Sequence, residues 1–110
     1  MYLLGIDLYN LGYFWESHEA FEALWHAAES ASLEKRFFQA IIQIAASNLK
    51  FFMGADGAGR ALAERALAKL SDVPAEFMGL DVDALRREVA ARIAGERLTP
   101  PPLRLCESTG

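Results

Sequence analysis

One histidine and several carboxylates lie close together in an aromatic-rich stretch near the N-terminus. Residues 12–25 read Gly-Tyr-Phe-Trp-Glu-Ser-His-Glu-Ala-Phe-Glu-Ala-Leu-Trp. His18 and Glu22 are four residues apart, so on a helix they lie one above the other. Five apolar residues share one arc of this helix, with His18 at its edge and Glu22 at its rim: Phe14, Phe21, Leu24, Trp25 and Ala28. Trp15 and Trp25 flank the pair of His18 and Glu22. Because an ionisable group is expensive to bury without a partner, its position among tryptophans points to this stretch as the candidate site.

The string His18-Glu19-x-x-Glu22 is similar to the zinc-binding helix motif of metalloproteases, with glutamate in place of the second histidine. In that chemistry two ligands at i and i+4 hold a divalent metal, and the intervening glutamate is the general base. The spacing therefore offers His18 and Glu22 as metal ligands and Glu19 as the base. A third ligand would have to be His26, another carboxylate or a group from a neighbouring subunit. Helical geometry turns Glu19 toward solvent.

A second polar stripe lies on the segment 33–53, which is otherwise apolar. At about 100° per residue its members fall within roughly 80° of one another: Arg36, Gln39, Gln43, Ser47 and Lys50. If the two helices pack antiparallel, this stripe can face the first one, because buried polar side chains need partners. The expected pocket or polar seam consists of Trp15, Glu16, Trp25, Gln39, Gln43 and Lys50, beside His18 and Glu22.

Three interpretations of this seam remain open. It could be the site of a metal-dependent hydrolase, with Gln43 orienting the substrate. It could be a pocket, with no metal, for a small molecule that has both cationic and anionic groups. It could also be a structural seam that only fixes the register of the helices, in a monomer or a dimer. Tyr2, Asp7 and Tyr9 could lend a hydroxyl or carboxylate, although no spacing requires it.

Helical periodicity runs through the whole chain, and no window shows the alternation typical of a strand. We expect helices over about 2–10, 13–29, 33–53, 57–70 and from after Asp81 to 94, with Ser32 and Asp56 as capping residues. The predicted fold is all-α, a compact antiparallel helical bundle of about four to five helices. Residues 1–98 are expected to form one domain, and 99–110 a Pro-rich C-terminal tail that drapes over the bundle or is disordered.

Composition limits the classes of partner and the compartment. The net charge is −4 with no basic cluster, which argues against nucleic acid and anionic membrane surfaces. The longest apolar stretch is interrupted by polar residues and is not expected to span a membrane. A single cysteine, Cys106, and an N-terminus without a signal-like cationic region favour a cytoplasmic protein. With 53% hydrophobic residues, some apolar surface is left for a partner, and we expect a homodimer.

Three blocks of the sequence are similar to a small helical family known as domain of unknown function 309. They are the stretch 12–25, the string Phe-Gln-Ala-Ile-Ile-Gln-Ile-Ala-Ala at 38–46, and residues 54–62. The resemblance covers about residues 2–70 and implies a compact helical bundle. Members of the family carry the label of predicted metal-dependent hydrolases, which implies His18, Glu19 and Glu22, with Glu16, as the positions to test. Lys50 departs from the family pattern, which often has histidine there, and as a cation it would pair with Glu22 or Glu19.

Overall fold

Five helices and one very short hairpin make up the fold in the computed structural model, which describes residues 1–106. The helices are α1 (Tyr2–Asn10), α2 (Phe14–Ala27), α3 (Leu33–Phe52), α4 (Asp56–Lys69) and α5 (Val82–Ile93). The hairpin pairs β1 (Glu76–Phe77) with β2 (Leu80–Asp81). The prediction of a compact helical bundle is confirmed, and every expected helix lies within three residues of its predicted bounds.

The ends of the helices follow from local hydrogen bonding, with one exception to the prediction. Ser32 caps α3, because its hydroxyl accepts a hydrogen bond from the backbone N–H of Lys35 at 3.1 Å. Asp81 caps α5 in the same way through the N–H of Ala84 at 2.9 Å. The predicted cap at Asp56 is wrong: this residue is the first of α4, and no side chain caps that helix. Its carboxylate still lies at the positive end of the helix dipole.

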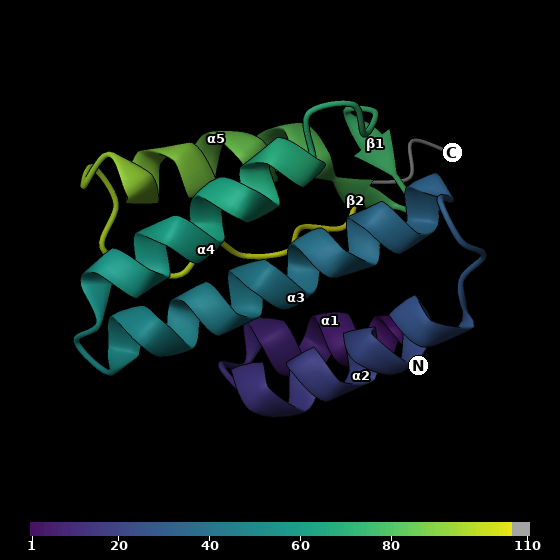
Figure 1. The fold of residues 1–110 in the computed structure, drawn as a ribbon, viewed down its shortest axis with the longest axis horizontal. Helices are drawn as coiled ribbons and strands as arrows, with labels where there is room; N and C mark the ends of the chain where they lie inside the picture. The colour runs from purple at the N-terminus through teal and green to yellow at the C-terminus, as the bar shows by residue number, and fades with distance from the viewer. Residues whose placement is uncertain (107–110) are drawn as a thin grey trace.

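α3 is the central helix of the bundle (Figure 1). α2 packs on one side of it and α4 on the other, while α1 packs on α2 and α5 on α4. The approach of α3 to α4 is close at Gly59, where an added Cβ would lie 2.8 Å from the ring of Phe51. Glycine suits this position because any Cβ would force the phenylalanine ring to shift.

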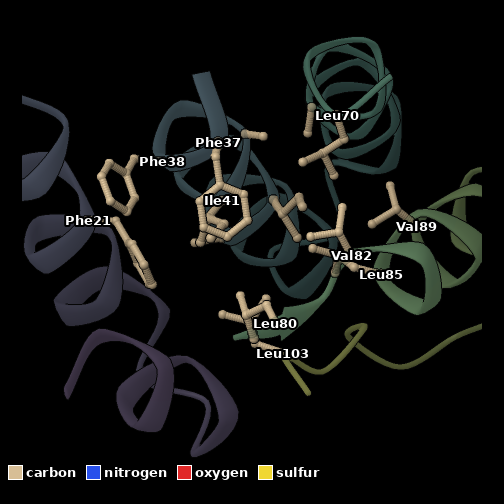
Figure 2. Packing of buried hydrophobic residues seen from close by; sticks show 14 of the residues in the cluster. Phe21, Phe37, Phe38, Ile41, Leu70, Leu80, Val82, Leu85, Val89 and Leu103 are labelled. Carbon is tan, nitrogen blue, oxygen red and sulfur yellow. The ribbon is translucent and has the colours of Figure 1, made fainter. Parts of the chain in front are cut away.

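One continuous apolar core joins the helices to the hairpin and to the C-terminal segment. Figure 2 shows Phe21 of α2 and Phe37, Phe38 and Ile41 of α3 on one side, and residues of β2 and α5 on the other. These residues are 5% exposed or less. The amphipathic arc predicted on α2 is confirmed, since Phe21 is fully buried and its apolar neighbours on the arc pack against the core: Phe14, Leu24, Trp25 and Ala28.

The hairpin is a structural element that helical periodicity did not predict. Only two residues on each side pair, so no alternation of apolar and polar residues can develop along the strands. Met78 and Gly79 form the turn with positive φ angles of 50° and 77°. Leu80 of β2 is buried in the core and forms an isolated bridge with Leu105.

The C-terminal segment lies along the bundle from Pro100 to Cys106 (Figure 1). Its backbone accepts hydrogen bonds from Tyr9 and Asn10 of α1, and Pro101 and Leu103 are buried. The tail was expected either to lie over the bundle or to be disordered, and the part up to residue 106 lies over the bundle. Residues 107–110, the end of the expected tail, lie outside the described residues. No helix within residues 1–106 is long and apolar enough to cross a membrane.

Candidate functional site

α2 presents three different environments around its circumference. Ser17 and Phe21 face inward and are fully buried, and the Ser17 hydroxyl donates to the carbonyl of Gly5 at 2.9 Å. Glu16 and Glu19 are exposed. His18 lies between these two faces, with 21% of its side chain exposed. The predicted position of His18 at the edge of the apolar arc is therefore confirmed.

A line of three ionisable side chains runs along the margin of α2. His18 Nδ1 lies 3.6 Å from one carboxylate oxygen of Glu22, and His26 Nε2 lies 3.7 Å from the other. Both distances exceed those of hydrogen bonds, so the contacts are electrostatic only when a histidine is protonated. His26 is 66% exposed, as expected for a surface histidine. Glu22 is thus the shared partner of two histidines, one at each neighbouring turn.

The two tryptophans differ in environment. Trp15 is 58% exposed and does not line the cavity between α2 and α3, and its ring stacks on His18 with an interplanar angle of 3° and 5.5 Å between centroids. Trp25 is partly buried and packs against the core. The ammonium of Lys35 lies 4.4 Å from the Trp25 ring centroid and donates to the Trp25 carbonyl at 3.0 Å. A cation thus already occupies one face of the Trp25 ring.

The polar stripe on α3 divides between two neighbours. Arg36 forms an ion pair with Asp72, and the Ser47 hydroxyl donates to the Gly59 carbonyl at 2.6 Å, so these two side chains face the α4 side. Gln39 lines a cavity together with Glu22 of α2. The idea that the whole stripe faces α2 is wrong, because α3 is a central helix with polar partners on both sides.

Lys50 is partly buried, and within residues 1–106 no ion pair joins it to Glu22 or Glu19. The expected charge pairing between α2 and α3 is therefore not formed. Gln43 is also partly buried, one helical turn beyond Gln39. The seam that remains between the two helices is shorter than the sequence stripe.

A cavity of about 190 Å³ lies at this seam, lined by Glu22, Trp25, Gln39 and Ile42. Three polar atoms of the seam residues are buried and have no hydrogen-bond partner within the described chain: His18 Nδ1, Trp25 Nε1 and Gln43 Oε1. Trp25 lines the cavity itself, while His18 and Gln43 lie one turn along from Glu22 and Gln39 on their helices. Since buried polar groups are almost always paired, three unpaired atoms on one seam need an explanation.

The fit of a divalent metal to these residues is limited. Within residues 1–106 no three His, Cys, Asp or Glu side chains come together in a group that could hold an ion. His18 and Glu22 could supply two ligands, and His26 reaches the same carboxylate only from its far side. Glu19 is exposed, as its helical position predicted, and it does not line the cavity between α2 and α3. These residues can therefore form hydrogen bonds with a ligand and supply one carboxylate, but the described residues do not form a complete coordination shell for a metal ion.

The sequence did not predict which polar partners the tyrosines of α1 contact. Tyr9 is 1% exposed, and its hydroxyl donates to the Pro101 carbonyl at 2.6 Å and accepts from Asn48 Nδ2 at 2.9 Å. Tyr2 donates to the Met78 carbonyl instead of reaching the seam. Periodicity places Tyr9 and Asn48 on inward faces, but which inward polar groups meet depends on the packing of α1 against α3 and the tail.

The comparisons with known proteins agree with the resemblance of the N-terminal blocks. No curated protein matches the chain. Residues 2–62 match a protein family whose description is "Domain of unknown function (DUF309)", and this match includes α1, α2, α3 and the beginning of α4. More than half of the chain lies within the match, and the chain therefore belongs to the DUF309 family.

Proposed function

We propose that the α2–α3 seam binds a small ring-bearing molecule that carries a cationic amine, and that the protein acts as a binding module. The observation that carries the proposal is that Trp25 lines the cavity while its buried Nε1 has no hydrogen-bond partner within residues 1–106. Two further buried atoms without partners, His18 Nδ1 and Gln43 Oε1, lie one helical turn from residues that line the cavity. A bound molecule that offers both donors and acceptors would satisfy such atoms.

The size and charge of the cavity indicate the class of ligand. A cavity of about 150 Å³ accommodates benzene, so 190 Å³ is enough for one ring with a short substituent. Within the described residues, Glu22 is the only charged group that lines the cavity, and its side chain is 48% exposed. A carboxylate at the entrance favours a cationic group there, while the indole N–H of Trp25 requires an acceptor deeper in the seam.

Two-dimensional ¹H–¹⁵N NMR tests the proposal directly, because Trp15 and Trp25 are the two tryptophans of the chain and give two indole N–H signals. The probe is 4-(aminomethyl)pyridine, which combines an ammonium group with a ring acceptor. Isonicotinate, which has the same ring with a carboxylate, is the matched probe of opposite charge. We expect the amine to shift the Trp25 indole signal saturably and isonicotinate not to shift it. The variant Trp15→Phe assigns the two signals.

Two glutamates of α2 form the matched pair of variants. Glu22→Gln removes the carboxylate that lines the cavity, whereas Glu19→Gln removes an exposed one nearby. We expect Glu22→Gln to weaken binding of the amine at least about threefold, since even a half-exposed ion pair contributes up to about 1 kcal/mol. Glu19→Gln should bind as the wild type does. Equal binding of amine and carboxylate, or equal weakening by both variants, would contradict the proposal.

A second candidate function is metal-dependent hydrolysis, and one contact favours it: the carboxylate of Glu22 lies between His18 and His26. Small rotations of these side chains would let Glu22 and one histidine share a divalent ion, which could activate a water molecule. Elemental analysis of protein purified without chelator tests this idea. Stoichiometric zinc, manganese or iron that disappears in both His18→Ala and Glu22→Ala supports it. A folded wild-type protein that takes up no metal even after metal is added refutes it.

A further inference from the structure

A second cavity, of about 230 Å³, lies where α4 begins and α5 ends. These two helix ends are at the left of Figure 1. Three arginines from different segments line it: Arg60 of α4, Arg92 of α5, and Arg97 after α5. One carboxylate, that of Asp56, lines the same cavity. None of these residues belongs to the α2–α3 seam.

Arg92 is the central group of this cavity. Its guanidinium carbon lies 4.2 Å from the ring centroid of Phe51, so one face of the planar group is fixed by stacking. Its Nη1 atom is buried and has no hydrogen-bond partner within residues 1–106. The arginines one to two turns earlier on α5 are different, since Arg86 and Arg87 both form ion pairs with Asp83. Within residues 1–106, no carboxylate forms an ion pair with Arg92.

The charges around the cavity do not balance. Three arginines and one carboxylate line the cavity. The positive charge of Arg97 disfavours the charged form of Arg92. Burial first, and then the neighbouring Arg97 charge, lower the pKa of Arg92. Arg97 is held in place because its Nε and Nη2 donate to the carbonyls of Thr99 and Pro100. Like charges that are held together around a cavity create a positive potential that an anion would relieve.

We propose that this cavity is a binding site for a tetrahedral oxyanion, with inorganic phosphate or a small phosphate monoester as the ligand class. Guanidinium groups form paired hydrogen bonds with phosphate oxygens, and Arg92 has a buried N–H that requires an acceptor. A phosphate group offers several oxygens in different directions, which suits donors that come from three segments. A planar carboxylate offers only two oxygens and suits a single guanidinium.

Isothermal titration calorimetry with inorganic phosphate at low ionic strength tests the site. We expect saturable binding of one phosphate per chain, with sodium chloride at equal ionic strength giving no such heat. Arg92→Gln should weaken phosphate binding at least about tenfold, because hydrogen bonds to charged groups are strong when desolvated. Arg60→Gln should weaken it about threefold, because an exposed charge contributes less. Arg60 is exposed, so its variant remains informative even if Arg92→Gln unfolds the protein.

Two control variants separate a specific site from general charge attraction. Arg65→Gln removes a charge from the same helix at an exposed position that does not line the cavity, and it should leave phosphate binding unchanged. Asp56→Asn removes the carboxylate in the cavity and should strengthen binding. Absence of saturable binding, or equal weakening by Arg60→Gln and Arg65→Gln, would overturn the proposal. Succinate that binds as tightly as phosphate would overturn the assignment to a tetrahedral anion.

Discussion

The substitution Tyr9→Phe tests whether the C-terminal segment is part of the cooperative fold. The Tyr9 hydroxyl is buried and joins three parts of the chain, because it donates to the Pro101 carbonyl and accepts from Asn48 of α3. Phenylalanine keeps the ring and its edge-to-face contact with Phe14, whose centroid lies 5.1 Å away. The change therefore removes hydrogen bonds with little loss of packing.

The magnitude follows from the two groups that the substitution leaves without a partner. A buried donor on Asn48 and a buried acceptor on Pro101 would each lose the hydroxyl at 2.9 and 2.6 Å. Leaving a buried polar group unpaired costs about 1–3 kcal/mol. We expect the free energy of unfolding to fall by about 2 kcal/mol, which is a large part of the stability of a small domain.

Urea denaturation followed by circular dichroism measures this difference. The urea midpoint should fall while the dependence on urea concentration stays the same. Tyr13→Phe is the matched control, because Tyr13 is 56% exposed and no hydrogen bond of its hydroxyl is recorded in the described chain. Its effect should be within about 0.5 kcal/mol. If the two variants lose the same stability, the buried hydrogen bonds do not hold the tail to the bundle.

The same residue predicts how stability depends on pH. Burial raises the pKa of the Tyr9 hydroxyl well above its ordinary value of 10.0. Below pH 10 the hydroxyl is protonated in both states, and above it the unfolded chain loses the proton while the folded protein keeps it. Stability therefore falls as the pH rises past 10, by at most about 1.4 kcal/mol per pH unit from this group. Tyr2 contributes in the same direction, and Tyr9→Phe should make the slope shallower without removing it.

Two further substitutions test other contacts of the fold. Gly59→Ala should destabilise the protein by about 1–2 kcal/mol in urea denaturation, because the new methyl would meet a phenylalanine ring of α3 at 2.8 Å. Gly57→Ala in the same helix has free space and should be neutral or slightly stabilising; two losses of equal size would contradict this steric argument. The guanidinium of Arg36 lowers the pKa of Asp72 through a hydrogen bond, so Arg36→Gln should raise that pKa toward its ordinary value in an NMR pH titration. An unchanged Asp72 titration would show that the ion pair does not form in solution.

The helices could be predicted from the sequence because their apolar residues recur with helical periodicity and several of their ends carry a local signal. Ser32 and Asp81 are capping residues, and Gly12, Gly54 and Gly95 follow helices with positive φ angles. Asp56 gave the same local signal, but it is placed inside the first turn of α4. Local signals predict that a helix is present more reliably than they predict the residue at which it begins or ends.

The candidate site was predictable in its position and less so in its contacts. The spacing on α2 predicted correctly that His18 lies at the margin and that Glu22 lies near it. It could not predict that Trp15 is exposed. Trp15 lies in the first turn of α2, and only one side of that turn faces the core. The direction of Ser47, toward α4, depends on how a third helix packs. The use of the seam for a metal or a small molecule is tested by the experiments above.

The arginine cavity illustrates a different limit of sequence analysis. Arg86 and Arg92 are on the same helix, and both have acidic residues nearby in the sequence. Only the first forms an ion pair with such a residue within the described chain. Arg97 follows Arg92 closely in the sequence, but Arg60 comes from a distant segment, and its approach to Arg92 follows from the packing of α4 on α5. No spacing along the chain carries that information.

The hydrogen bonds between α1 and the C-terminal segment have a consequence for synthesis of the protein. Tyr9 and Asn10 find their partners 92 and 93 residues later in the chain. While the chain is being made toward its C-terminus, these polar groups must stay hydrated or find substitute partners, although α1 can already pack on α2. A chain that ends before residue 101 would leave the Tyr9 hydroxyl and the Asn10 amide without these partners, which would expose this region to proteases and to aggregation.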